Sequence, residues 1–308
     1  MLLSQLKCMI DRRRPCWPMF IGYLIWCSGS GAPPAAQAPA QPVANLPALL
    51  AQVQANVAKN GKLLEQYTSD EFWHNRNFDK NGKITLDESA KYENVFVEGL
   101  PYRKKVEANG KPLAGKEAAA EEERYEKAVS ERRLMTTEQK RMSLHMTWHS
   151  SLPMCCLSTL FSNRIAGYEQ VGGREMVVVE SVPRAGAKPS NDDERSALGW
   201  REKSWIDLAD AMLARVEAES LVDKNHMVRG MTIRMDFDRA IDAPATDGNA
   251  ERPVWLLRSI TNQFRFRFLW AEGSGITEQS WTNYKKFHVD IRLLEDTVTP
   301  TNDGPRVQ

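Results

Sequence analysis

The sequence predicts an α+β fold: one curved antiparallel sheet with helices packed on its concave side. Three stretches alternate apolar and polar side chains residue by residue, around Met231–Phe237, Trp255–Trp270 and Trp281–Ile291. A period of two is that of a strand, whose successive side chains point to opposite faces. Long strands with aromatic residues on one face are typical of a sheet that curves around an apolar interior, which helices or an apolar ligand then cover.

The apolar sides of these three strands supply the candidate ligand-binding residues. Leu256, Ile260 and Trp270 share the parity of the phenylalanines in the second strand. We expect one cavity to be lined by eight candidates: Met231, Ile233, Met235, Phe237, Phe264, Phe266, Phe268 and Trp281. The alternative is an ordinary packed core, because most inward aromatic side chains are simply buried. Arg265 and Arg267 have the other parity, so cations and aromatics do not share a face and no nucleic-acid partner is predicted.

The earlier part of the chain begins with a helix and a hairpin. Apolar residues recur at helical spacing from Leu46 to Leu64. Strands are expected at Tyr67–Phe78 and Lys83–Val97, joined through Asn81-Gly82, which is typical of a type I′ turn with positive φ at both residues. A third strand, Tyr102–Ala108, ends at a second Asn-Gly pair.

A helical insertion, 114–160, separates this hairpin from the later strands. Its first part, Ala114 to Leu144, carries charges at i,i+4 spacing and reads as a solvated helix. Its second part, Leu144–Leu160, is more apolar and is expected to be buried. Further strands follow at Arg164–Val171, Arg174–Val182, Lys203–Asp207 and Leu213–Ser220.

The N-terminus has the pattern of an export signal. Arg12 to Arg14 precede an apolar run, Trp17–Trp26, and Ala36-Gln37-Ala38 resembles a cleavage site. Two alternatives remain, an uncleaved anchor and a lipoprotein signal with lipidation at Cys27. We expect a signal peptide over 1–38, a Pro/Ala-rich spacer over 39–47, a domain over 48–296 and a disordered tail over 297–308. The mature chain contains no apolar stretch long enough to span a bilayer. Together with the export signal, this predicts a protein of the periplasm or of the periplasmic face of the outer membrane.

Charge and cysteine content exclude several classes of protein. Lys and Arg number 41 against 40 Asp and Glu, a net charge of +1 in 308 residues, so no global field recruits nucleic acid or an anionic membrane. After signal removal only Cys155 and Cys156 remain, and this vicinal pair in an apolar run favours buried packing over a redox or soft-metal site. No disulfide framework is predicted.

Two motifs resemble metal sites and have simpler interpretations. The segment from Asn77 to Glu88 matches the spacing of a calcium loop, but a hairpin explains Asn81-Gly82 equally well. His145 and His149 share a helical face, with no third ligand in register. The sequence contains no glycine-rich phosphate loop and no nucleophile elbow. We therefore predict no cofactor, no metal and no catalytic residues, and we classify the protein as a non-enzyme.

Several stretches resemble a set of uncharacterised exported bacterial proteins labelled outer-membrane lipoprotein-sorting proteins. They are Tyr92–Arg103 with Asn109–Leu113, Ser204–Asp207 with Asp210, Arg215–Ala218, and Ser280–Phe287. The resemblance covers about Tyr67 to Leu293. It implies a fold similar to that of LolA, LolB and RseB, an unclosed antiparallel half-barrel with helices on its concave side, and it carries no functional residues over.

The predicted function follows from the apolar face and the resemblance. We expect a cell-envelope carrier that holds a lipid or an acylated lipoprotein in a hydrophobic half-barrel cavity. The alternative is a non-enzymatic envelope sensor or scaffold, with a fully packed core and protein partners.

Overall fold

The computed structural model describes residues 43–140, 142–143, 159–223, 227–241, 253–268 and 271–286. Contacts divide the chain into two units, Met1–Pro39 and Ala40–Gln308, and all described residues belong to the second. The predicted signal peptide, the C-terminal tail, the two His residues of the candidate metal site and the Cys155-Cys156 pair lie outside the described residues. None of the helices in the described ranges is both long and apolar enough to cross a bilayer.

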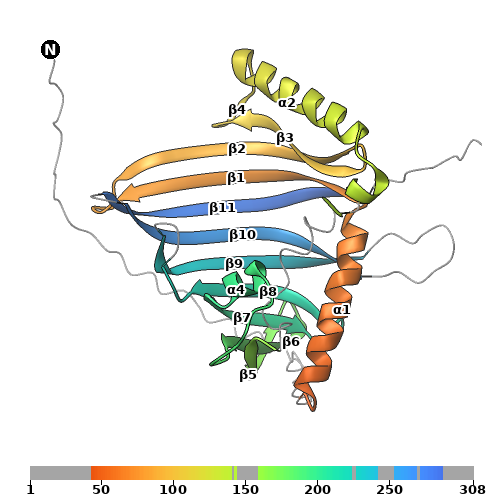
Figure 1. The fold of residues 1–308 in the computed structure, drawn as a ribbon, viewed down its shortest axis with the longest axis vertical. Coiled ribbons are helices and arrows are strands. Elements are labelled where there is room, and N and C mark those ends of the chain that lie inside the picture. The colour runs from red at the N-terminus through yellow and green to blue at the C-terminus, as the bar shows by residue number, and fades with distance from the viewer. Residues whose placement is uncertain are drawn as a thin grey trace, which may run out of the picture. The chain divides into compact units, whose positions relative to one another are not determined.

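Eleven described strands form one antiparallel sheet (Figure 1). Their order is β4-β3-β2-β1-β11-β10-β9-β8-β7-β6-β5, and the two edge strands β4 and β5 are not paired with each other, so the sheet is unclosed as predicted. In chain order the strands are β1 Tyr67–Asp79, β2 Ile84–Val97, β3 Leu100–Ala108, β4 Lys111–Pro112, β5 Phe161–Val171, β6 Arg174–Pro183, β7 Trp200–Asp207, β8 Met212–Ser220, β9 Met227–Ile241, β10 Pro253–Phe268 and β11 Ala271–Lys286.

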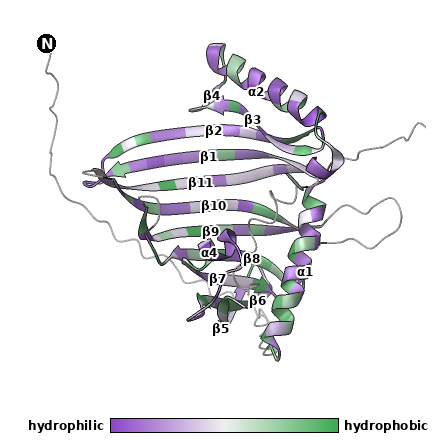
Figure 2. Cartoon of the chain, in the orientation of Figure 1, coloured by the Kyte–Doolittle hydropathy of each residue, from purple (hydrophilic) through white to green (hydrophobic). Residues whose placement is uncertain are grey.

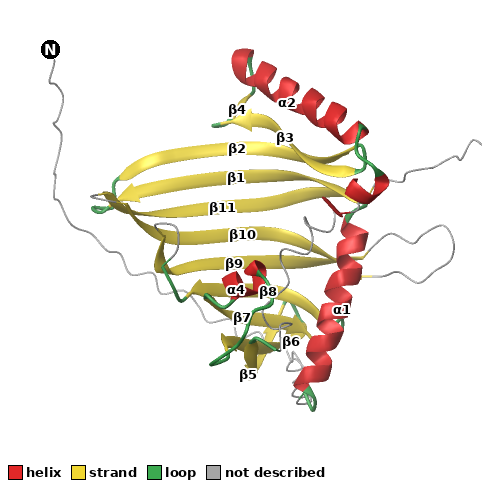
Figure 3. Ribbon diagram, viewed as in Figure 1, coloured by secondary structure: helices red, strands yellow, loops and turns green. Residues whose placement is uncertain are grey.

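Helices α1 Leu46–Leu64, α2 Gly115–Arg133 and α4 Asp192–Ala197 accompany the sheet (Figure 3). The charged insertion is less continuous than predicted, because α2 ends at Arg133 and a turn precedes the next helical residues, 137–140. α2 buries none of its residues, and Figure 2 shows it mostly in hydrophilic colours. It is held along β3 by polar contacts, such as the Tyr102 hydroxyl that donates to Glu121 Oε1 at 3.1 Å.

The segment that resembled a calcium loop is a hairpin turn. Asp79 Oδ1 accepts hydrogen bonds from the backbone N–H groups of Asn81 (2.8 Å) and Lys83 (2.9 Å), so this carboxylate organises the loop itself. Gly82 has φ +78°, whereas Asn81 is not among the residues with positive φ, so the hairpin prediction is confirmed and the type I′ assignment is wrong. The second pair does have positive φ at both Asn109 and Gly110.

α1 packs on one face of the sheet, here called the helix face. Leu50 and Val53 of the helix bury against alternate residues of the strands, including Val177 on β6, Ile206 on β7 and Val216 on β8. The two-residue period of the strands thus meets the apolar stripe of the helix. The Asn60 side chain fixes the helix further, since it donates to Trp255 O at 2.8 Å and accepts from Trp255 N at 2.9 Å.

A buried acidic turn between β7 and β8 contacts the middle of α1. Asp207 is fully buried and takes Arg174 in a two-point ion pair, with Nη2 to Oδ1 at 2.7 Å. Asp210 accepts from Arg239 at 2.6 Å, and Asn56 of α1 donates to the backbone carbonyl of Asp210 at 2.9 Å. Burial works against ionisation of Asp210, but the hydrogen bonds from Arg239 and Trp255 outweigh it and keep its pKa below the ordinary value.

Two features of the later strands differ from the prediction. A register shift of β10 against β9 between Leu257 and Ser259 places Leu256 opposite Asp238 and Ile260 opposite Met235. The bulge therefore sends Leu256 and Ile260, which share a parity in the sequence, to opposite faces. The last strand begins at Ala271, not near Trp281, and Phe287 to Ile291 lie outside the described residues.

Candidate functional site

Cross-strand register brings the predicted ligand-binding residues onto the helix face. Met235 and Phe237 pack against the α1 cluster, which fixes the face of β9 that carries odd-numbered residues. Met235 pairs with Ile260 on β10, and from there every second residue of β10, including Phe264 and Phe266, keeps this face. Trp281 of β11 lies on the same face, opposite Glu71 of β1. Phe268 pairs with Ala271 at the strand end.

The candidates are neither fully buried nor fully exposed. Met231, Ile233, Phe264, Phe266 and Trp281 are all half-buried, in contrast to the fully buried Val177 and Ile206 beneath α1. α1 contacts β8 and β10. Met235 and Phe237 pack against the α1 cluster. The other candidates lie farther along β9, β10 and β11.

Phe264 and Phe266 lie over glycines of the neighbouring strand. Phe264 pairs with Gly275 and Phe266 with Gly273. A methyl group on Gly273 would stand 2.6 Å from Cζ of Phe266, and one on Gly275 would stand 2.6 Å from Cε2 of Phe264. Each ring therefore covers bare backbone on β11, and the two phenylalanines lie against the sheet.

Polar residues occupy the helix face on β1 and β11. Glu71 is 3% exposed, and its carboxylate accepts from Arg103 Nε at 2.7 Å and from Gln279 Nε2 at 3.1 Å. The Arg103 guanidinium also stacks on Tyr92, 3.4 Å from the ring centroid. Burial, together with the charge of Glu71, raises the pKa of Tyr284, whose hydroxyl donates to Leu257 O at 2.5 Å. The helix face is thus mainly apolar over β9 and β10, whereas over β1 and β11 polar side chains stand beside Trp281.

The opposite face, here called the charged face, carries a row of alternating charge. Register aligns one residue from each of five adjacent strands, β5 to β9, with signs that alternate from strand to strand: Arg164, Glu180, Lys203, Glu217 and Arg234. Arg164 pairs with Glu180, and Arg234 lies 3.8 Å from Glu217. Opposite charges across strands favour this register, because a slip would bring like charges together.

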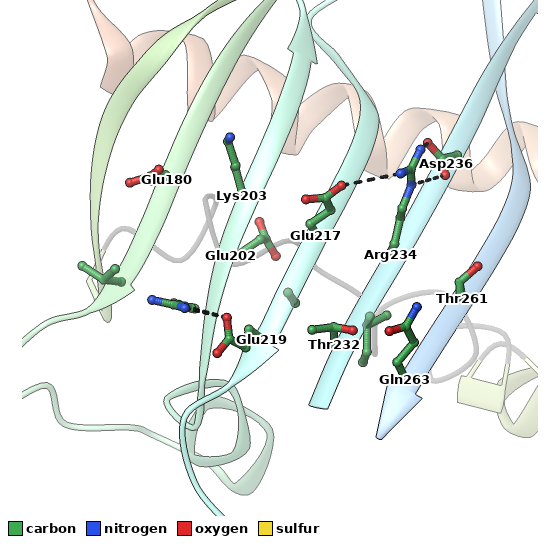
Figure 4. A pocket seen from close by; sticks show the side chains of 14 residues that line it. Glu180, Glu202, Lys203, Glu217, Glu219, Thr232, Arg234, Asp236, Thr261 and Gln263 are labelled. Atoms are coloured by element: carbon green, nitrogen blue, oxygen red, sulfur yellow. Dashed lines mark hydrogen bonds and ion pairs between the residues drawn. The ribbon is translucent and has the colours of Figure 1, made fainter. Parts of the chain in front are cut away.

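A hollow of about 800 Å³ lies on the charged face (Figure 4). Its walls include Lys203, Glu217 and Arg234 of the charge row, together with Thr232, Thr261 and Gln263. In Figure 4 these side chains stand on one side of the strands and the orange helix α1 lies behind them. Ile233 borders the hollow as well, although its register places it on the helix face.

Asp236 sits at the end of this hollow between two arginines. It accepts from Arg215 Nε at 2.7 Å and from Arg234 Nε at 2.8 Å. Burial is the largest influence on this carboxyl and opposes ionisation, but the two arginines outweigh it and hold the pKa of Asp236 below its ordinary value. Asp236, Arg215 and Arg234 are thus paired with one another. The hollow is polar, and its walls carry five acidic and three basic side chains.

Sequence patterns pointed to one of these two sites and missed the other. The hollow draws its residues from β6 to β10, and only cross-strand register brings them together. The sequence did contain one signal for the hollow: the polar residues that alternate with the apolar ones on β9 and β10 line one of its walls. Within the described ranges, no group of three or more His, Cys, Asp or Glu side chains is placed to hold a metal ion.

No family model and no curated protein sequence matches the chain. Solved structures similar to it include a putative outer membrane lipoprotein-sorting protein domain from Vibrio parahaemolyticus, at 12% identity and a TM-score of 0.32, covering 82% of this chain and 96% of that one. A DUF1329 family protein from Desulfovibrio piger is 13% identical with a TM-score of 0.26, covering 79% and 95%. A LolA superfamily protein from Nitrosomonas europaea is 9% identical with a TM-score of 0.24, covering 77% and 94%.

These similarities carry no information about ligand or partner, given their identities and TM-scores. The fold is defined by the chain's own strand order, in which β4 and β5 stay unpaired at the two edges. The described sheet is the unclosed antiparallel half-barrel that the resemblance to LolA, LolB and RseB implied.

Proposed function

We propose that this protein is a non-enzymatic binding protein of the cell envelope that holds an acyl chain of a lipid or lipoprotein on the helix face. The observation that carries the proposal is the shared face and partial burial of Phe264, Phe266 and Ile233 on neighbouring strands. Half-buried apolar side chains side by side leave surface that an acyl chain would remove from water, at roughly 25 cal/mol per Å². The export-signal pattern before residue 40 supports the envelope as its compartment.

Native mass spectrometry of protein purified without detergent tests the proposal directly. A copurified mass in the range of a lipid, lost on organic extraction, is the expected result. A fluorescent fatty-acid probe titrated into the extracted protein should then bind, and Phe266→Ser should weaken this binding. Arg267→Ser is the matched control, because it changes the same strand on the opposite parity. A clean apo mass together with no probe binding would contradict the carrier function.

A second candidate function rests on the hollow of the charged face. Its acidic and basic side chains on β7, β8 and β9, with the acidic ones in excess, suit a polar, charged segment of a protein partner, as in an envelope sensor or scaffold. Binding there would weaken as salt increases. Charge reversal by Glu217→Arg should abolish such binding and leave the fatty-acid probe unaffected, so one variant separates the two candidates.

A further inference from the structure

A row of uncharged hydrogen-bonding side chains crosses the helix face beside the phenylalanines. Register aligns Asn75 of β1, Thr277 of β11 and Asn262 of β10. Thr277 Oγ1 donates to Asn75 Oδ1 at 2.9 Å. Two residues along β1, Asn77 pairs with Gly275. Phe264 pairs with the same glycine from the other neighbouring strand, β10. A methyl group on Gly275 would stand 2.7 Å from Asn77 Oδ1, so this amide and the Phe264 ring meet over the glycine.

Two amide oxygens of this row are buried without a hydrogen-bond partner. They are Asn77 Oδ1 and Asn262 Oδ1, each with no donor among the described residues. A buried acceptor that lacks a donor costs free energy, and such groups in folded proteins are uncommon. An apolar side chain such as Leu would avoid this cost at either position. Thr277 already satisfies Asn75, so the two unsatisfied amides flank a satisfied pair.

Neighbouring groups give no reason to expect an anionic ligand at this row. A cation on the same face, Arg103, donates to both carboxylate oxygens of Glu71, at 2.7 and 2.6 Å. Its charge is therefore balanced within the protein. Uncharged groups with N–H or O–H donors match the two amide oxygens better than a carboxylate or phosphate does.

We propose that the ligand is an amphiphile whose uncharged polar end carries hydroxyl or amide N–H groups, and that the buried amides of Asn77 and Asn262 turn towards it to accept their hydrogen bonds. Its acyl chain then lies over Phe264 and Phe266, next to the row. This inference rests on the carrier function proposed above and specifies the polar end of the ligand. The apolar residues of β9 and β10 hold the chain, and the amide row selects the headgroup.

Two probes with the same chain and different headgroups test it. 1-Monooleoylglycerol has two hydroxyl donors and methyl oleate has none, and each is titrated against the bound fluorescent fatty-acid probe in the full mature chain. We expect the wild-type protein to prefer monooleoylglycerol by on the order of tenfold, since one to two hydrogen bonds are at stake. Asn262→Leu and Asn77→Leu should each reduce this preference several-fold, and the double variant should bring it close to one.

Thr261→Val serves as the matched control, because it removes one polar group from the adjacent residue on the charged face and should keep the wild-type preference. Circular dichroism and thermal melts confirm that each variant folds. Equal affinity of the wild type for both probes, or a preference that survives in the double variant, overturns the headgroup inference and leaves the carrier function standing. Failure of both probes to bind overturns the carrier function, and this inference with it.

Discussion

Phe264 and Gly275 face each other across β10 and β11, with the aromatic ring lying on the glycine backbone. Phe266 and Gly273 repeat the arrangement two residues along. Glycine weakens a strand because it has no side chain to pack. The two rings supply that packing from the neighbouring strand, and this is how a glycine-containing segment, Ala271–Lys286, forms a strand of sixteen residues.

Gly275→Ala should destabilise the protein, because the new methyl group would meet both the Phe264 ring and Asn77 Oδ1. Overpacking of this kind typically costs about 1–3 kcal/mol. Gly167→Ala is the control: that glycine also lies in a strand and has no atom within 4 Å of an added methyl group. Urea denaturation measures both. If the two variants unfold at the same urea concentration, the packing of the rings on the glycines does not contribute to the free energy of unfolding.

Phe266→Asp should be strongly destabilising, whereas Arg265→Asp should cost within about 0.5 kcal/mol. The first places a carboxylate on the helix face, where it loses hydration or shifts its pKa upward to become neutral. The second changes an exposed residue of the opposite parity. Thermal melts compare the two, and equal destabilisation would show that the face assignment of β10 is wrong.

Phe266→Ala separates a packed core from a ligand-binding face. In a packed core, loss of a phenylalanine typically costs about 3–5 kcal/mol through the cavity that it leaves. We expect a smaller loss here, since Phe266 is half-buried, together with weaker binding of the fatty-acid probe. A full core-sized loss with unchanged probe binding would favour the scaffold function.

Arg174→Ala should cost about 3–5 kcal/mol, because it leaves the fully buried Asp207 carboxylate without its cation. Arg201→Ala, which removes an exposed cross-strand partner of Glu219, should cost about 1 kcal/mol or less. Urea midpoints at neutral pH give both values. A milder effect of Arg174→Ala would mean that Asp207 keeps its hydrogen bonds by other routes, such as the N–H of Asp210.

Asp236 should make stability depend on acid pH. Its folded-state pKa lies below the unfolded value of about 3.9, so its ionised form stabilises the fold at neutral pH. This contribution is complete above the unfolded pKa and is lost as the pH falls through the folded pKa. Asp236→Asn should therefore be less stable than wild type at pH 7, and the gap should narrow as the pH falls from about 5 towards 2. Urea titrations across that range measure it, with the exposed Asp238→Asn as control. A gap that stays constant with pH would contradict the assignment.

Local patterning determined most of the elements from the sequence alone. The helix Leu46–Leu64, the hairpin around Gly82 and the end of β3 before Asn109-Gly110 match the structure within a few residues, because the helical period and the turn glycines act within one or two turns of chain. The shared face of Met235, Phe264 and Trp281 also followed from a period of two. The start of β11 could not be predicted from this period. Gly273 and Gly275 are typical of a loop, and only the structure shows that Phe266 and Phe264 cover them within a strand.

Tertiary structure decided which residues of different strands meet. The bulge near Arg258 sends Leu256 and Ile260 to opposite faces, and a single extra residue of this kind leaves no trace in the alternation of polarity. The pairing of Glu71 with Arg103, the charge row from Arg164 to Arg234 and the amide row at Asn262 all depend on strand order and register. Sequence specifies the face of each strand locally, whereas register is set by contacts between strands far apart in the chain, and those contacts place the polar groups that distinguish a binding face from a plain core.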